Sequence, residues 1–493
     1  MKPVFRFQTT ELDGLQVFHD RRSLQEQAAS GLLPEKRRNK VKMEKKENTS
    51  ALLFDLYGKP SMGQAFPLAL QHVVAMIVGC VTPAIIVAGA GGLSDRDSVI
   101  LIQAALVVSA LTTLVQLYPL GKGKLRIGSG LPVIMGISFA YVPTMQAIAG
   151  DFGVGTILGA QIAGGIVAVV VGISIKQIRK FFPPLITGTV VFAIGLSLYP
   201  TAINYMAGGV GSEQYGSWQN WLIALLTLVI VTGLNHYGKG IWKLSSILIG
   251  IIAGYVMSLL FGIIDFSAVS GASFFQLPKP LHFGLVFEPS ACVAIGVLFA
   301  INSIQAIGDF TATTTGGLDR LPEDEELNGG IVAYGCCNII SALFGGLPTA
   351  TFSQNVGIVS STKVVAKRVF GLAAGILLVA GLIPRFSSVL LTIPNCVLGG
   401  ATVSVFASIA MTGVKLITAA PMNYRNTTIV GLSIALGMGI TQANAALASF
   451  PGWVTTIFGK SPVVLATITA IILNLVLPRE KEEKDIEIMK EET

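Results

Sequence analysis

Only a few polar side chains that can bind a solute or move a proton interrupt the apolar stretches of this chain. The carboxamides of Gln305 and Gln354 can each donate and accept hydrogen bonds, so either can pair with a ligand that carries both kinds of group. Asp309 follows Gln305 by four residues, on the same face of a helix. Because ionisable residues inside a membrane are costly, Asp309 and His72 are functional candidates. A purely structural, hydrogen-bonded role is the alternative for both.

The composition indicates that these residues belong to a membrane protein. Of the 493 residues, 52% are hydrophobic and 12% are charged, whereas a soluble protein carries about 25% charged residues. The mean hydropathy is +0.69. Apolar stretches of about 20 residues, long enough to cross a hydrocarbon core of about 30 Å, recur along the chain. These features predict an all-α polytopic membrane protein.

The apolar stretches predict fourteen transmembrane segments, near residues 66–89, 98–117, 131–149, 154–173, 184–205, 219–235, 244–263, 290–311, 329–345, 354–366, 369–384, 390–412, 427–446 and 461–478. Lysine and arginine concentrate in the gaps after even-numbered segments, with Arg96, Lys279, Arg385 and Lys460 as exceptions. Because positive residues favour the cytoplasmic side, both termini are expected in the cytoplasm. The net charge of +7 is then explained by topology, and nucleic acid is not an expected partner.

Both ends of the chain are expected to form polar tails. Residues 1–50 are predicted to be a disordered basic cytoplasmic tail, 51–478 the transporter domain and 479–493 a charged cytoplasmic tail. No cleavable signal peptide is expected, because nothing apolar precedes residue 51. The five cysteines lack metal-type spacing and are interpreted as small apolar fillers. Neither a metal nor a cofactor is therefore expected.

The sequence also repeats itself weakly. The tripeptide Gly-Leu-Pro opens the third segment at 130–132 and the tenth at 346–348. Six residues after each proline stand 138–139 (Ser-Phe) and 354–355 (Gln-Asn). The matching segments are seven apart, and because seven is odd, the halves form a 7+7 inverted repeat. Short Gly/Pro-interrupted segments at matching positions point to a midplane substrate site, although two packing breaks without function are the alternative.

Three local sequences carry a family resemblance. Residues 354–363 read Gln-Asn-Val-Gly-Ile-Val-Ser-Ser-Thr-Lys, segment one contains Gln71-His72, and segment eight contains Gln-Ala-Ile-Gly-Asp at 305–309. Together they resemble the nucleobase-ascorbate, or nucleobase-cation symporter-2, transporters, and within them the xanthine and uric acid permease branch. The resemblance covers about residues 53–478, with the motifs in the expected order and spacing.

The resemblance implies an architecture and a mode of action. It implies a core domain of segments 1–4 and 8–11 and a gate domain of segments 5–7 and 12–14, with short strands in segments 3 and 10. It also implies an elevator-like motion, proton-coupled symport, a homodimer and a place in the cell membrane, among its lipids. A purine such as xanthine or urate would be the substrate, and no enzyme activity is implied.

The expected substrate contacts suit a purine dione, whose flat rim alternates N–H donors with C=O acceptors. In relatives a glutamine at the position of Gln354 accompanies xanthine and urate carriers, and a glutamate accompanies uracil carriers. Gln305 and Asn355 would supply further hydrogen bonds, and Phe139, beside Ser138, would stack on the ring. The alternatives are an interhelical hydrogen bond for Gln354, plain core packing for Phe139 and a local strut for Asn355.

Two positions depart from the family pattern. Gln305 stands where relatives have a carboxylate thought to take part in proton coupling, and Tyr334 stands where many purine carriers have an aspartate. Proton coupling is therefore expected to depend on Asp309, with His72 and its neighbour Gln71 as further candidates or as site architecture. The loss of a negative charge at 305 also reduces repulsion of an anionic substrate, which favours urate over xanthine.

Several other functions were weighed against this one. Within the family, uracil, hypoxanthine or ascorbate are alternative substrates, and an uncoupled facilitator is the alternative to symport. An anion exchanger shares the inverted-repeat architecture but lacks the 354–363 signature. No paired catalytic acids or Ser/His/Asp arrangement suggests an enzyme, and no repeated filter segment suggests a channel.

Overall fold

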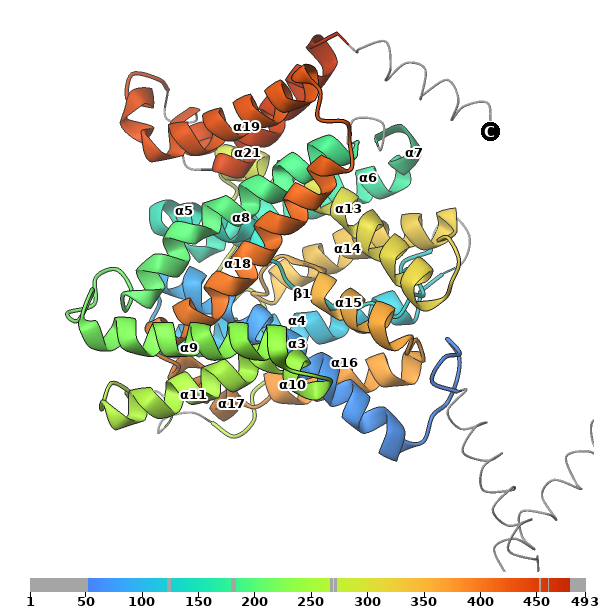
Figure 1. Ribbon diagram of the computed structural model, residues 1–493, viewed down its shortest axis with the longest axis vertical. Coiled ribbons are helices and arrows are strands. Elements are labelled where there is room, and N and C mark those ends of the chain that lie inside the picture. The colour runs from blue at the N-terminus through green and yellow to red at the C-terminus, as the bar shows by residue number, and fades with distance from the viewer. Residues whose placement is uncertain are drawn as a thin grey trace, which may run out of the picture.

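The computed structural model describes residues 52–121, 126–178, 183–266, 269, 273–451, 454–459 and 461–478. The described chain is almost entirely helical, with one small sheet near its centre (Figure 1). The two tails predicted at 1–50 and 479–493 lie outside the described residues, so their disorder stays a prediction.

Helices occupy the positions of most predicted segments. Seven of the described helices are long and apolar enough to cross a membrane: α3 (Met62–Ala90), α4 (Asp95–Leu117), α6 (Val154–Ile173), α8 (Pro184–Met206), α9 (Trp218–Tyr237), α13 (Pro289–Gly317) and α18 (Asn395–Thr418). Helices that do not meet this combined criterion of length and apolarity occupy the other predicted positions: α5 (Val142–Phe152), α11 (Ser246–Leu260), α14 (Asp324–Leu343), α15 (Ser353–Thr362), α16 (Lys367–Gly381), α19 (Tyr424–Gln442) and α21 (Pro462–Val476). The chain is thus a multi-pass membrane protein, while the exact number of spans stays a prediction.

One short helix is not expected from the sequence. α17 (Pro384–Leu391) follows α16 after a break of two residues and is bent by 83° from it. Pro384 is its first residue, and proline cannot donate the hydrogen bond that would continue α16. The predicted eleventh segment therefore ends in a corner at this proline, and α18 begins only after Pro394.

A short strand follows each of the two Gly-Leu-Pro sequences, and the second strand precedes the 354–366 range predicted for segment ten. β1 (Met135–Ile137) and β2 (Thr349–Thr351) pair antiparallel, with Gly136 opposite Ala350. β1 leads through the 3₁₀ turn η2 (Phe139–Tyr141) into α5, and β2 leads into α15. Two segments about 210 residues apart thus meet at the centre of the molecule.

The hydrogen bonds of this crossing leave little of its backbone unpaired. Beyond the strand pairing, the N–H of Phe352 donates to the carbonyl of Ile134 (2.9 Å), and the N–H of Ser138 donates to that of Pro348 (3.1 Å). Non-helical backbone inside a membrane is tolerated where protein satisfies it. The helices can therefore begin at the crossing without a large cost in lost hydrogen bonds.

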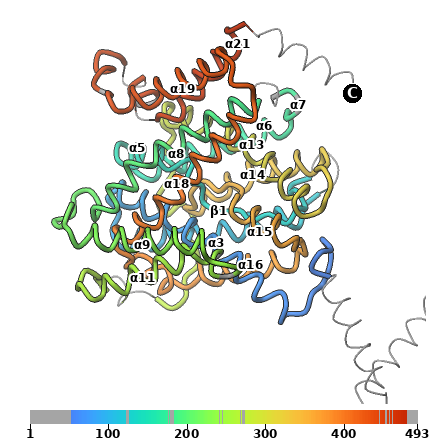
Figure 2. Tube along the Cα trace, viewed as in Figure 1, coloured from blue at the N-terminus to red at the C-terminus, as the bar shows by residue number. Residues whose placement is uncertain are grey.

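The helices pack in two sets around this crossing. α6 packs against α13 and α14, and α16 packs against α3 and α4. In the second set, α8 packs against α18, α9 against α11 and α18, and α19 against α21. Figure 2 shows α8 and α18 running side by side past the central strand, with α19 and α21 at one end of the molecule.

Small residues bring α8 and α18 into backbone contact. A Cβ atom on Gly195 would lie 2.5 Å from the backbone nitrogen of Ala410, and one on Gly413 would lie 2.3 Å from that of Phe192. Neither position has room for a side chain. Membrane helices associate closely through such residues, because lipid supplies no hydrophobic force between them.

Candidate functional site

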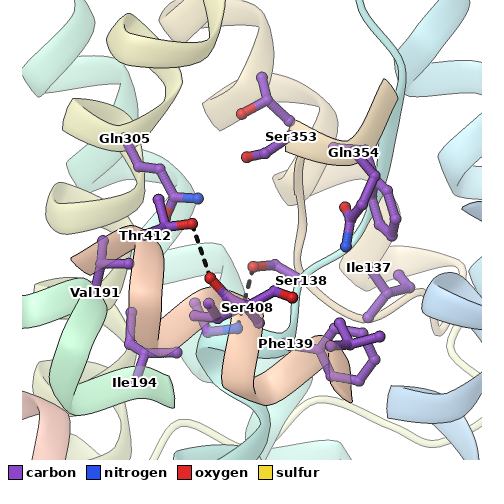
Figure 3. Close-up of a pocket in the computed structure, with 15 residues that line it drawn as sticks. Ile137, Ser138, Phe139, Val191, Ile194, Gln305, Ser353, Gln354, Ser408 and Thr412 are labelled. Carbon is purple, nitrogen blue, oxygen red and sulfur yellow. Dashed lines mark hydrogen bonds between the residues drawn. The ribbon is translucent and has the colours of Figure 1, made fainter. Parts of the chain in front are cut away.

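A cavity of about 260 Å³ lies where the two sets of helices meet the strand crossing. One wall comes from the crossing and α13, and the other comes from α8 and α18. An engineered protein cavity of about 150 Å³ holds a benzene ring, so this space is large enough for a flat bicyclic ring. Figure 3 shows the side chains that surround it.

The two candidate glutamines line this same cavity from different elements. Gln305 comes from α13 and Gln354 from the first turn of α15. Figure 3 shows them on opposite sides of the open space, and neither carboxamide has a hydrogen-bond partner among the described residues. Each amide is thus free to donate and to accept toward a ligand.

Ser138 and Phe139 also line the cavity, beside Gln354. The Ser138 hydroxyl accepts a hydrogen bond from the N–H of Ala140 (3.2 Å), so it caps η2. Phe139 is only 6% exposed and packs edge-on against Phe406 of α18, with 5.1 Å between ring centroids. The aromatic ring therefore contributes both to the cavity lining and to the packing between the two walls.

Asp309 lies behind the lining and holds the crossing to α13. Its carboxylate accepts hydrogen bonds from the hydroxyls of Thr351 (2.5 Å) and Ser353 (2.9 Å to Oδ1). Both of these donors line the cavity, and Asp309 itself is 9% exposed. The acid is thus one side chain away from the cavity and is connected to it through two hydroxyls.

His72 and Asn355 contact each other outside the cavity lining. Nδ2 of Asn355 donates to Nδ1 of His72 (3.0 Å) and to its backbone carbonyl (3.1 Å). The imidazole also packs against Phe370, with ring centroids 4.5 Å apart. This geometry requires an unprotonated Nδ1, and so a neutral imidazole. Gln71 is half-buried on α3 and does not line the cavity either.

Tyr334 is buried in an aromatic cluster away from the cavity. Its hydroxyl hydrogen bonds to that of Tyr141, and its ring stacks on Phe299 with centroids 5.2 Å apart. Tyr141 lies in η2 and also contacts Phe299 (5.1 Å). Tyr334 thus supports the turn after β1.

The structure therefore gathers four of the predicted residues, Ser138, Phe139, Gln305 and Gln354, around one cavity and leaves Asn355 outside it. It also adds residues that the sequence analysis did not single out. Among them are Thr351 and Ser353, and Ser408 and Thr412 on α18. The α18 pair was detectable, because Ser404, Ser408 and Thr412 recur every four residues on an apolar segment and so share one helix face.

Relatives of this chain are transport proteins. The chain is 35% identical to the uric acid permease PucJ of Bacillus subtilis over 429 residues, covering 85% of this chain and 94% of PucJ. It is 31% identical to the xanthine permease XanQ of Escherichia coli K12 over 446 residues, covering 87% of this chain and 94% of XanQ.

Solved structures of more distant transporters share the fold. The transmembrane domain of the cyanobacterial bicarbonate transporter BicA aligns with a TM-score of 0.51 and 18% identity, covering 83% of this chain and 97% of that domain. The structure of SLC26A9 aligns with a TM-score of 0.57 and 11% identity, covering 88% of this chain and 69% of that chain. At such low identity the likeness extends to the fold alone.

The match to a family spans most of the transporter domain. Residues 63–446 match the Permease family of xanthine and uric acid permeases, over the same region that contains the crossing, the cavity and the 354–363 signature. The chain therefore belongs to this permease family, the nucleobase-cation symporter-2 family, and is a transporter rather than an enzyme.

Proposed function

We propose that this chain transports an oxidised purine, xanthine or urate, and that the purine binds in the cavity between Gln305 and Gln354. The observation that carries the proposal is the pair of carboxamides without other partners on opposite sides of one cavity, beside Phe139. Relatives named uric acid permease and xanthine permease support the same substrate class.

The rim of the purine matches this arrangement. Each carboxamide can pair with one N–H and one adjacent C=O of the substrate, and the Phe139 ring can contact its flat face. A substrate that lacks the matching groups leaves a buried polar atom unpaired and is rejected. Hypoxanthine, which lacks one of the two carbonyl groups, and uracil, which has the same dione rim but no imidazole ring, are the alternatives to be tested.

The lining favours an anionic purine. Among the described residues, no lysine, arginine, histidine, aspartate or glutamate lines the cavity. A carboxylate at position 305 would repel an anion, and Gln305 does not. Urate is largely a monoanion at neutral pH and xanthine partly so, and we therefore place urate ahead of xanthine.

The Gln305→Glu variant tests this order. It is expected to lower urate uptake more than xanthine uptake at neutral pH, and acidification that protonates the introduced carboxylate should narrow the difference. If the ratio of urate uptake to xanthine uptake in this variant equals that of the wild type at every pH, the preference for an anionic substrate does not depend on residue 305.

Transport would proceed by an elevator motion of one helix set against the other. The cavity lies between α8 and α18 on one side and α13 with the strand crossing on the other. We assign the first of these sides to the gate of segments 5–7 and 12–14, and the second to the core of segments 1–4 and 8–11, as the family resemblance implies. A cysteine pair that fixes Thr412 to Gln305 should block transport when oxidised and restore it when reduced, whereas transport through the oxidised pair would contradict relative motion of the walls.

Proton coupling would depend on Asp309. The carboxylate accepts from Thr351 and Ser353, so taking up a proton removes an acceptor and releases one hydroxyl beside the cavity. Proton binding is thereby connected to the shape of the site. Asp309→Asn should abolish accumulation driven by a pH gradient and still permit exchange of labelled substrate, while a wild type that never accumulates substrate under a proton gradient would be an uncoupled facilitator.

The central experiment is uptake of radiolabelled urate, xanthine, uracil and guanine into cells that lack their own carriers, with and without a protonophore. Urate or xanthine uptake abolished by the protonophore is the expected result. Uptake of uracil alone would contradict the substrate assignment.

The proposed topology, with both termini in the cytoplasm, places the 206–218 loop outside, because this loop contains no lysine or arginine. Reporter fusions that place residue 212 in the cytoplasm would contradict it. Homodimer formation in the cell membrane stays an expectation, and crosslinking in membranes measures it.

A further inference from the structure

Two hydroxyls on α18 form a polar strip on the otherwise apolar wall of the cavity. Ser408 and Thr412 lie one helical turn apart and both line the cavity, whereas their neighbours in that wall are apolar, among them Val191, Ile194 and Ile409. Figure 3 shows the two side chains facing the open space that also contains the glutamines. A polar strip on an apolar wall suggests a specific contact.

The hydrogen bonds that these two hydroxyls already donate determine which hydrogen bonds they can form with a substrate. Ser408 Oγ donates to the carbonyl of Ser404 (2.9 Å), and Thr412 Oγ1 donates to the carbonyl of Ser408 (2.9 Å). A hydroxyl has one proton and two lone pairs, so each group faces the cavity only as an acceptor. The α18 wall therefore selects for N–H donors, whereas the glutamines can pair with donors and acceptors alike.

We propose that Ser408 and Thr412 are specificity residues that accept hydrogen bonds from the imidazole-ring N–H groups of the purine. This inference depends on the proposed function. When the glutamines hold the pyrimidine ring of a flat bicyclic substrate, its five-membered ring extends toward α18. Urate carries two N–H groups on that ring, neutral xanthine carries one, and uracil has no such ring. The two hydroxyls thus increase the affinity for urate over xanthine, and for purines over pyrimidines.

The test combines methylated derivatives of the substrate with variants of the two hydroxyl residues and compares their effects on affinity. Affinities of xanthine and of its 7-methyl and 9-methyl derivatives are measured as inhibition of labelled substrate uptake by the wild type and by the Ser408→Ala/Thr412→Val double variant. In the wild type, methylation of the nitrogen that donates should weaken binding by about 2- to 13-fold, as expected for one neutral hydrogen bond. In the double variant, xanthine should lose a similar factor, and the methylation penalty should disappear.

Two further variants separate a lost contact from a damaged helix. Thr418→Val removes a hydroxyl with the same bond to its own helix (Thr418 Oγ1 to the carbonyl of Val414, 3.0 Å) outside the cavity, and should keep the wild-type penalty. Thr412→Ser keeps the hydroxyl and should also keep the wild-type methylation penalty. This variant still tests the inference if the double variant does not reach the membrane.

A methylation penalty that is equal in wild type and double variant would overturn the inference, because the methyl group would then only collide with the wall. A penalty lost in Thr412→Ser would overturn it as well. Uptake of no purine by the wild type would instead contradict the proposed function itself.

Discussion

The two segments that cross at the centre of the molecule have the same plan but different contacts. The segment from β1 to η2 is held by neutral contacts: Ser138 caps its own turn, Phe139 packs against Phe406 of α18, and the Tyr141 hydroxyl bonds to that of Tyr334. The segment from β2 to α15 is instead held from outside, because Thr351 and Ser353 donate to Asp309 of α13.

This difference separates two tasks. The β1 segment presents a hydroxyl and an aromatic face, and the partners that hold it are uncharged. The β2 segment begins α15 without a side-chain cap, and its first turn carries the free carboxamide of Gln354. A segment whose position depends on an acid can respond to a proton, whereas one that depends on packing cannot. Of the two strand segments, the second is thus attached to a carboxylate, whereas the first is held by uncharged partners.

The largest effect is expected from removing the hydrogen bonds between Asp309 and the β2 segment. Asp309→Leu leaves the buried Thr351 hydroxyl without its acceptor, at about 1–3 kcal/mol, and removes the hydrogen bond that holds the exposed Ser353. Transport should fall by at least about 30-fold, and the melting temperature of the purified protein should fall with it. Asp319→Asn, which changes an acid paired with Lys363 on the surface (2.8 Å), is the control and should behave as the wild type. Full transport by Asp309→Leu would show that β2 needs no anchor.

The next effect in size concerns the recognition group on the β2 segment. An ionised carboxylate can only accept, so Gln354→Glu loses the donor half of its pairing with the substrate. Affinity for xanthine or urate should drop roughly 5- to 150-fold, equivalent to about 1–3 kcal/mol, in competition uptake assays. Gln64→Glu makes the same change at the start of α3, outside the cavity lining, and should have no effect. If Gln354→Glu binds every purine with wild-type affinity, the Gln354 side chain does not contact the substrate.

Much of this site was predictable from the sequence, because membrane burial makes polar residues conspicuous. β1 lies within the predicted third segment, β2 lies just before the 354–366 range predicted for the tenth, and both glutamines reach one cavity. Position 354 was matched to 138 by its distance from a proline. The structure shifts this correspondence: Ser138 directly follows β1, whereas Gln354 is the third residue after β2. Phe352, the N-cap of α15, is the residue equivalent to Ser138 in the secondary structure.

The remainder depends on contacts between distant segments, which one sequence does not reveal. Asn355 is a carboxamide residue in an apolar segment, like Gln354. It is one residue further along the helix, however, and its side chain contacts His72 on α3. The two hydroxyl donors to Asp309 are separated from it by more than 40 residues. The short helix α17 was not expected either, because segment eleven was predicted to end at Pro384 and the residues after it, Arg385 among them, were assigned to a gap.

An intermediate effect is expected from the central pair of the sheet, where Gly136 faces Ala350. A Cβ atom on Gly136 would lie 2.5 Å from Sγ of Cys80 and 2.8 Å from two ring atoms of Phe352, both tightly packed. Gly136→Ala should therefore destabilise the protein by about 1–3 kcal/mol, measured as a lower melting temperature in detergent. Ala350→Gly, the reciprocal change in β2, adds no atom and should cost less than Gly136→Ala. Equal melting temperatures for the two variants would show that the strands are interchangeable.

The smallest effect is expected at Ser138, and it decides what this residue does. As the N-cap of η2 its hydroxyl accepts from the N–H of Ala140, and loss of such a cap costs about 0.5–2 kcal/mol. If capping is its whole contribution, Ser138→Ala should lower the melting temperature slightly and leave substrate affinity within about twofold of wild type, since one neutral hydrogen bond contributes only about 0.5–1.5 kcal/mol. Ser138→Thr keeps the hydroxyl and should restore stability. An affinity loss well beyond twofold, with an unchanged melting temperature, would instead make Ser138 a direct ligand, and the β1 segment would then share recognition of the substrate with the β2 segment.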